Sequence, residues 1–225
     1  MNRIEMLSVK NFLSWINPKC MHKKQFIAAG VSLDIAKKAL IMLHGRGGSA
    51  NDILGLAADL HLSGFAIIAP EATSQSWYPY SFLSPPSLNE PWLSSSLDLL
   101  EEITADLNAK GIVSENMYFL GFSQGACLTL EYVARNAQKY GGVVAFTGGL
   151  IGDRIYKENY TGNFSGTPVL LASGDPDQHV PTERVGASAV VISGMGASVT
   201  KIIYPNLGHT ISAEEIILAN KIVFR

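Results

Sequence analysis

The G-x-S-x-G stretch at residues 121–125 constrains the fold of this chain more than any other feature of the sequence. It follows an apolar run at 116–120 that favours a β-strand, and it precedes a helical pattern at 126–135. A strand-to-helix turn this tight leaves no room for side chains two residues before and after the serine, and it presents the Ser123 hydroxyl above the sheet. The alternative is an ordinary turn in which Ser123 caps the helix, because the motif also arises by chance in a chain with 21 glycines.

Strand-like and helix-like segments alternate along most of the chain. Strand-like runs occur at 39–43, 65–69, 116–120, 142–147, 168–173 and 199–204. The first two are continuous apolar runs, which are typical of strands buried on both faces of a sheet. Patterns typical of helices lie between them, at 50–60, 92–109, 126–135, 182–193 and 212–221. This order predicts an α/β fold with a mostly parallel central sheet and helices on both faces.

The length of 225 residues suits one sizeable domain, which we place at residues 25–225. Residues 1–24 form an N-terminal extension for which the sequence predicts no definite structure. Charged and polar residues interrupt its apolar positions and no small-residue cleavage site follows, which argues against a signal peptide. Because recognisable organisation begins only later, Met21 is an alternative start of the chain.

Composition argues against several classes of function. The net charge of −2 and the 16% of charged residues give no support for a nucleic-acid-binding surface. No apolar run reaches the length that spans a membrane, and no cluster of histidine, cysteine or carboxylate residues has the spacing of a metal site. Two cysteines cannot form a disulfide framework, which favours a reducing compartment and hence the cytoplasm.

Polar segments follow four of the predicted strands at the point where each strand ends. They are residues 44–49, Ser123, residues 175–179 and His209. In open α/β sheets, ligands bind at the carboxyl ends of the strands. The sequence therefore predicts one site at this edge of the sheet, built from all four segments.

A serine hydroxyl needs a base within hydrogen-bond reach to act as a nucleophile. His209 is the expected base, because it follows the last strand and completes the chain order Ser, Asp, His that accompanies a strand-to-helix elbow. His179 is the second candidate. The remaining histidines are interpreted as lying outside the catalytic set; they are His22, His44 and His61.

The acid and the oxyanion donors are less sharply defined by the residues alone. Asp175 and Asp177 follow the same strand, and either could orient the histidine while the other caps the turn. Backbone amides should bind the oxyanion, and the amide of Gln124, directly after the serine, is one of them. The second is expected from Arg46 or Gly47, because glycines in this turn let the backbone approach a substrate. A phosphate-binding turn is the alternative, but the lysine and Ser/Thr pair of a nucleotide loop are missing.

A long irregular segment at 71–91 carries aromatic residues between prolines that prevent regular structure. Segments of this length inside a compact domain are often functional. The candidate substrate-binding residues are therefore Gly47, Trp77, Tyr78, Trp92 and His179. The alternative is that the aromatic side chains pack the segment onto the domain.

Together these segments resemble the phospholipase/carboxylesterase group of the α/β-hydrolase superfamily, which includes acyl-protein thioesterases and small bacterial carboxylesterases. The likeness covers residues 39–225 and rests on the motifs LHGRGG at 43–48, GFSQGA at 121–126, DQHVP at 177–181 and GHTIS at 208–212. It implies Ser123 as the nucleophile and His209 as the base. The amides of Arg46 and Gln124 would form the oxyanion hole. The family's aspartate three residues before a Val-Pro pair selects Asp177.

The resemblance implies an α/β-hydrolase fold, with a short aromatic-rich loop in place of a large lid. It implies hydrolysis of small-molecule carboxylic esters, short to medium in chain length, through an acyl-enzyme and without cofactor or metal. The chain would be a monomer or homodimer, with no nucleic-acid partner and no stable membrane insertion. The segment at 71–91 differs from that of acyl-protein thioesterases and looks closer to bacterial carboxylesterases. The alternatives are a thioesterase or lysophospholipase with the same triad, and a non-catalytic binding protein on a hydrolase scaffold.

Overall fold

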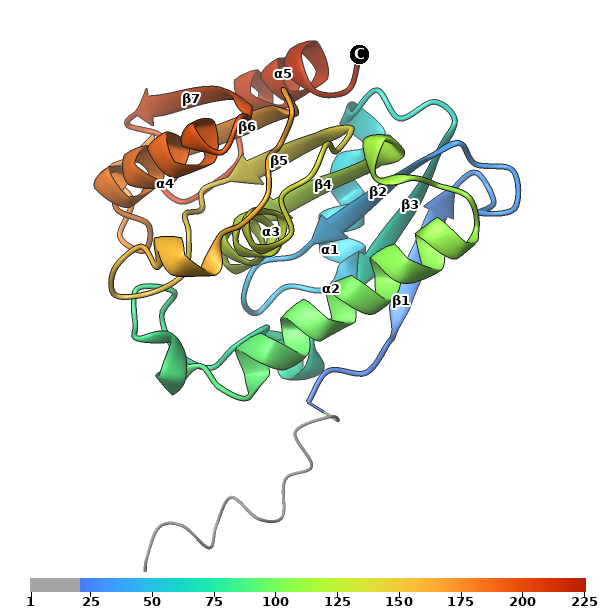
Figure 1. Ribbon diagram of the computed structural model, residues 1–225. Coiled ribbons are helices and arrows are strands. Elements are labelled where there is room, and N and C mark those ends of the chain that lie inside the picture. Colours follow the sequence, from blue (N-terminus) through green and yellow to red (C-terminus); the bar gives the residue numbers. More distant parts are fainter. Residues whose placement is uncertain (1–20) are drawn as a thin grey trace, which may run out of the picture.

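A seven-stranded β-sheet forms the centre of the molecule in the computed structural model, which describes residues 21–225 (Figure 1). The strand order is β1-β3-β2-β4-β5-β6-β7, in which β1 is antiparallel to β3 and the remaining pairs are parallel. The strands are β1 (Phe26–Gly30), β2 (Lys38–Leu43), β3 (Phe65–Pro70), β4 (Met117–Phe122), β5 (Gly142–Phe146), β6 (Pro168–Asp175) and β7 (Ser198–Pro205). The central strand β4 leads directly into Ser123.

Helices cover both faces of this sheet, as Figure 1 shows. On one face lie α2 (Trp92–Ala109), α3 (Gln124–Arg135) and α4 (Thr182–Gly194), and on the other lie α1 (Ala50–Leu54) and α5 (Ala213–Ile222). Strand β2 contributes to both cores, because successive side chains of a strand point to opposite faces: Ile41 and Leu43 pack on one side, Leu40 and Met42 on the other. The predicted mostly parallel α/β architecture is confirmed.

The structure divides the helix predicted at 50–60 into two pieces. The α-helix α1 begins after a capping box formed by Ser49 and Asp52, and it ends at Leu54. A 3₁₀ helix follows at Gly55–Asp59, and the glycine at the junction favours the change because it has low helix propensity. The segment at 71–91 remains irregular, apart from short 3₁₀ turns at Thr73–Gln75 and Pro86–Leu88.

The N-terminal part of the described chain packs against the domain before β1 begins. Met21 and His22 are both buried, and the Thr73 hydroxyl donates a hydrogen bond to the Met21 carbonyl (2.6 Å). The packed region therefore reaches back beyond residue 25, where the sequence suggested that the domain begins. That division stays a prediction for residues 1–20, which lie outside the described part. Within residues 21–225, no helix has both the length and the apolar character needed to cross a membrane.

Candidate active site

Ser123 lies in a strained turn between β4 and α3. Its φ and ψ angles are 54° and −120°, a backbone conformation that L-residues rarely adopt. The two glycines of the motif make this turn possible: a Cβ on Gly121 would lie 2.4 Å from the Gly125 carbonyl oxygen, and one on Gly125 would lie 2.2 Å from that of Leu43. The Ser123 side chain does not cap α3, so its hydroxyl is left for other partners.

A continuous hydrogen-bonded relay joins Ser123, His209 and Asp177. The Ser123 hydroxyl lies 2.8 Å from Nε2 of His209, and Nδ1 of the same ring lies 2.7 Å from Oδ2 of Asp177. Because a carboxylate only accepts hydrogen bonds, the neutral imidazole carries its proton on Nδ1 and leaves Nε2 free to accept from the serine. The His209 side chain remains 26% exposed, whereas that of Asp177 is 0% exposed.

The loop after β6 holds Asp177 as a carboxylate. Its Oδ1 accepts hydrogen bonds from the amides of His179 (2.7 Å) and Val180 (2.9 Å). Burial acts to raise the pKa of Asp177, but these two amides and the His209 ring outweigh burial and hold the pKa below its usual range. The other candidate, Asp175, is an exposed residue at the end of β6. Of the two aspartates, the structure brings Asp177 into contact with His209.

Two free amides lie near the serine. The amide of Arg46 forms no hydrogen bond within residues 21–225, whereas that of Gly47 already donates to the Gln75 carbonyl (2.8 Å). The amide of Gln124, at the start of α3, likewise has no partner in the described region, as expected for the first turn of a helix. The turn before Arg46 is close to the nucleophile, since a Cβ on Gly45 would lie 3.4 Å from that of Ser123. This arrangement favours Arg46 over Gly47 as the second oxyanion donor.

A cavity of about 540 Å³ opens beside Ser123. It is lined by Arg46, Tyr78, Pro79, Tyr80, Ser81, Phe82, Ser123, Gln124, Cys127, His179, Val180 and His209. Tyr78 and His179 are the two predicted substrate-binding residues that line it. The ring of His179 also packs edge-on against that of His209, with centroids 4.9 Å apart.

The other three predicted substrate-binding residues lie elsewhere. Trp77 is 0% exposed, and its indole donates to the His44 carbonyl behind the cavity (2.9 Å). Trp92 packs edge-on against the ring of His22, with centroids 5.4 Å apart. Gly47 does not line the cavity, and its amide donates to the Gln75 carbonyl. For the two tryptophans, the packing interpretation of the aromatic segment describes the structure better than the lining interpretation.

Residues 76–82, of which 78–82 line one side of the cavity, form a segment that we call the aromatic wall. The Arg46 guanidinium holds its backbone: Nη1 donates to the Pro79 carbonyl (2.8 Å), and Nη2 donates to those of Tyr78 (2.8 Å) and Tyr80 (2.7 Å). Nη1 also donates to the Ser76 hydroxyl (3.0 Å). A planar fork of donors suits several carbonyls at once, so this contact depends on arginine.

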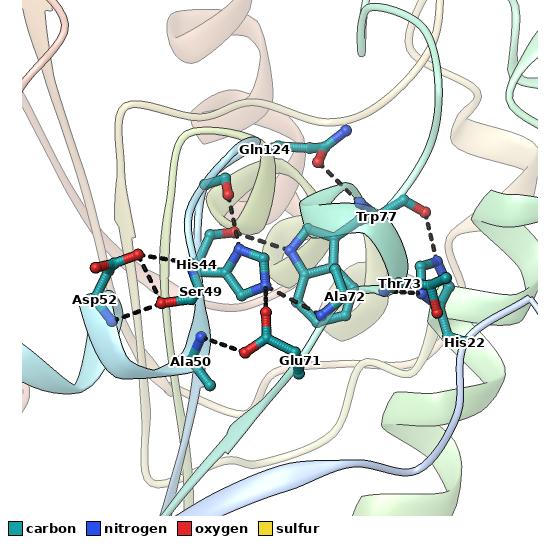
Figure 2. Close-up of polar contacts among 11 residues, drawn as sticks. His22, His44, Ser49, Ala50, Asp52, Glu71, Ala72, Thr73, Trp77 and Gln124 are labelled. Atoms are coloured by element: carbon teal, nitrogen blue, oxygen red, sulfur yellow. Dashed lines mark hydrogen bonds and ion pairs between the residues drawn. The ribbon is translucent and has the colours of Figure 1, made fainter.

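The side chain of Gln124 binds the same wall from the nucleophile's side. Its Oε1 accepts from the Trp77 amide (2.9 Å), and its Nε2 donates to the Tyr78 carbonyl (2.7 Å). Figure 2 shows the Gln124 side chain directed at Trp77, whose indole lies next to His44. Both residues that carry the free amides therefore also hold the aromatic wall with their side chains.

His44 braces this region rather than facing the serine. Its Nδ1 donates to the Gly45 carbonyl (2.7 Å), and its Nε2 accepts from the Ala72 amide (3.1 Å). Oε1 of Glu71 lies 3.7 Å from the same Nε2 (Figure 2). The His44 side chain is 1% exposed. These contacts leave His44 outside the relay of Ser123, His209 and Asp177.

Several cavity residues were not singled out from the sequence. Phe82 lies within the aromatic segment, and Val180 lies within the DQHVP motif, but neither carries a polar signal. Cys127 lines the cavity and follows Ser123 by four residues, about one helical turn. Residues at this spacing lie on the same face of a helix, so the sequence could have placed Cys127 beside the serine. Burial raises the pKa of its thiol to about 12, so Cys127 is not a rival nucleophile at neutral pH. No group of three or more metal-ligating side chains occurs among residues 21–225.

Comparisons with known proteins find one matching family and a similar solved structure. The family described as Phospholipase/Carboxylesterase matches residues 28–223. A solved structure of a phospholipase/carboxylesterase from Dyadobacter fermentans DSM 18053 is 52% identical, with a TM-score of 0.90 and coverage of 91% of this chain and 98% of that one.

Two curated relatives are more distant. "Probable carboxylesterase SOBER1-like" from Arabidopsis thaliana is 33% identical over 126 residues, which are 55% of this chain and 48% of the relative. "Acyl-protein thioesterase 1" from Gibberella zeae is 32% identical over 108 residues, 47% of this chain and 46% of the relative. The chain thus spans about half the length of the curated relatives that it matches.

Proposed function

Because the chain belongs to the phospholipase/carboxylesterase family, we propose that it is a serine hydrolase that cleaves carboxylic esters through an acyl-enzyme. The observation that carries this proposal is the relay from Asp177 through His209 to the Ser123 hydroxyl, with bonds of 2.7 and 2.8 Å. A base within 3 Å of a serine, oriented by a buried carboxylate, is the arrangement that activates a hydroxyl for acyl transfer.

In the first step, Oγ of Ser123 attacks the ester carbonyl carbon while its proton moves to Nε2 of His209. The carbonyl oxygen becomes an oxyanion, which accepts hydrogen bonds from the amides of Arg46 and Gln124. Asp177 stabilises the imidazolium that forms. The C–O bond to the alcohol then breaks, and His209 returns its proton to the leaving alkoxide.

In the second step, water takes the place of the alcohol. His209 accepts a proton from the water as its oxygen attacks the acyl carbon, and the same two amides hold the second oxyanion. Collapse of this intermediate breaks the bond to Oγ, which recovers its proton from His209. The carboxylic acid leaves, and Ser123 is ready for another ester.

The cavity supports esters of short to medium chain length. Its volume of about 540 Å³ accommodates a compact substrate, and Phe82, Cys127 and Val180 supply buried apolar surface beside the serine. The proposed partner is therefore a small-molecule ester. A series of p-nitrophenyl esters from acetate to palmitate tests this substrate class, with an optimum expected at the short end. An optimum at palmitate would instead favour a lipid substrate.

A thioesterase is the second candidate, because the same relay hydrolyses thioesters and one relative is named an acyl-protein thioesterase. Butyrylthiocholine and p-nitrophenyl butyrate present the same acyl group on sulfur and on oxygen. A kcat/KM at least as high for the sulfur compound would favour this candidate.

Replacement of the nucleophile tests the mechanism directly. We expect Ser123→Ala to lower kcat on p-nitrophenyl butyrate by about 10⁴-fold or more and to abolish labelling by a fluorophosphonate probe. The fold should persist, which circular dichroism can verify. Wild-type activity in this variant would rule the mechanism out, and an unlabelled wild-type protein would favour a non-catalytic scaffold.

A further inference from the structure

His22 is fixed on both of its ring nitrogens. Nδ1 accepts a hydrogen bond from the Thr73 amide (3.2 Å), so the proton of the neutral ring lies on Nε2, which donates to the Trp77 carbonyl (2.9 Å). The ring is buried between Trp77 and Trp92, with centroid distances of 5.6 and 5.4 Å. Figure 2 shows His22 on the opposite side of Trp77 from Gln124.

Trp77 connects His22 to both sources of the free amides. Its own amide donates to Oε1 of Gln124 (2.9 Å), and its indole donates to the carbonyl of His44 (2.9 Å), two residues before Arg46. A displacement of the Trp77 backbone therefore acts on Gln124 and on the turn that carries Arg46. Neither contact involves a group that reacts.

The Trp77 carbonyl has a second donor, the Ser96 hydroxyl, but that hydroxyl also has another acceptor. The hydrogen bond from His22 is therefore the one that fixes the Trp77 carbonyl most directly. The Ser96 hydroxyl donates to that carbonyl (2.7 Å) and also lies 3.0 Å from the Trp92 carbonyl. A hydroxyl has one proton, so it cannot serve both carbonyls fully. The Nε2–H of His22 has no such competitor among the contacts of the described chain.

We propose that His22 is a positioning residue for the oxyanion hole and acts through the backbone of Trp77. This inference rests on the proposed function, because it assigns His22 to the geometry of the Arg46 and Gln124 amides. Those amides stabilise the transition state only if they point at the developing oxyanion, and small displacements of such donors lower kcat. His22 lies outside the residues 28–223 that match the family.

The simpler interpretation is that His22 merely anchors the start of the domain. Two other contacts serve that purpose without touching Trp77. The Thr73 hydroxyl donates to the Met21 carbonyl (2.6 Å), and the His22 amide donates to the Ser95 hydroxyl (3.0 Å). Their removal loosens the anchor, whereas loss of the Nε2–H donor leaves the Trp77 carbonyl with only the shared hydroxyl of Ser96.

Two amide replacements separate the functions of the two ring nitrogens. The nitrogen of a glutamine amide reaches about as far as Nε2, so His22→Gln keeps a donor for the Trp77 carbonyl. The oxygen of an asparagine amide falls near Nδ1, so His22→Asn keeps the acceptor for Thr73 but loses that donor. Both variants are uncharged, and Thr73→Val is the matched control that weakens only the anchor.

Kinetics of the full-length variants on p-nitrophenyl butyrate give the first readout. We expect His22→Asn to lower kcat by about tenfold with KM changed less than about twofold, because the loss falls on the transition state. His22→Gln and Thr73→Val should keep kcat within about twofold of wild type. Equal kcat values for the two His22 variants, or a loss in Thr73→Val as large as that in His22→Asn, would overturn the proposal.

NMR gives a readout that does not depend on activity. In ¹⁵N-labelled protein, the backbone amides of Arg46 and Gln124 should shift in His22→Asn and stay near their wild-type positions in His22→Gln. Unshifted resonances in His22→Asn would overturn the inference even if the wild-type protein hydrolysed no ester. Absence of hydrolysis by the wild type would count against the proposed function alone.

Discussion

The two sides of the cavity around Ser123 are held in different ways. On the side of β6 and β7, Asp177 and His209 contact each other and the serine through the atoms that the proposed reaction uses. On the opposite side, Arg46 and Gln124 use their side chains to hold the backbone of the aromatic wall. Side-chain chemistry matters on the first side, and the position of a backbone matters on the second. Substitutions should therefore have different signatures on the two sides.

The largest effect is expected on the first side, from Asp177→Asn. The asparagine oxygen can still accept from the amides of His179 and Val180, but its NH₂ group would face Nδ1 of His209 and favour the wrong tautomer. We expect kcat to fall by about 10⁴-fold. Asp175→Asn is the matched control and should retain wild-type kcat. Comparable kcat values for Asp177→Asn and Asp175→Asn would contradict the proposal that side-chain chemistry matters on the first side.

A smaller, mixed effect is expected on the second side, from Arg46→Lys. An ammonium group cannot donate to three carbonyls and a hydroxyl from one plane, so the aromatic wall loses part of its support. We expect kcat/KM to fall by about tenfold and the free energy of unfolding by about 1 kcal/mol. Arg154→Lys provides the control, since Arg154 is exposed and pairs with Glu158. Loss of activity without loss of stability would place Arg46 with the residues of the first side.

The smallest expected effect is that of mild acid on the free energy of unfolding. Residues on the two sides of the cavity should lose their contributions to stability in different pH ranges. Burial lowers the pKa of His22, the bond to Trp77 opposes that effect, and nearby His44 adds to it. The neutral ring thus stabilises the fold above about pH 6.5, and this contribution is lost as the pH falls from there toward the lowered pKa. The lowered pKa of Asp177 gives stability that is present above about pH 3.8 and lost only below it.

Urea unfolding of wild type and His22→Gln, measured between about pH 7.5 and 5, isolates the first of these effects. The stability advantage of the wild type should shrink in this range, because glutamine does not titrate. An advantage that grows toward pH 5 would mean that the charged ring is favoured in the fold, contrary to the direction of the pKa shift.

The same contrast explains what the sequence could predict. Ser123, Asp177 and His209 are polar residues at strand ends, and the proposed reaction restricts their types and their order. The motif and the resemblance therefore predicted that these three residues lie together, and the structure brings them into contact. The sheet was predicted because buried parallel strands are continuous apolar runs.

The sequence could not predict which residues of the aromatic wall line the cavity. The sequence gives the same apolar signal for Trp77, which is buried behind the cavity, and for Phe82, which lines it. The difference depends on hydrogen bonds between Trp77 and residues far away in the chain, His44 and Gln124. The sequence does not indicate a role for His22 for a related reason. The partners of its ring, Thr73 and Trp77, follow it by about fifty residues or more, and no local sequence pattern predicts these contacts.

The buried thiol of Cys127 has a practical consequence. It lines the cavity, but with a pKa of about 12 it carries almost no thiolate at neutral pH. Thiolate is the form that peroxides and alkylating reagents attack, so Cys127 should be slow to oxidise and slow to label. The proposed hydrolysis at Ser123 should therefore survive treatment with peroxide or iodoacetamide under conditions that modify exposed thiols.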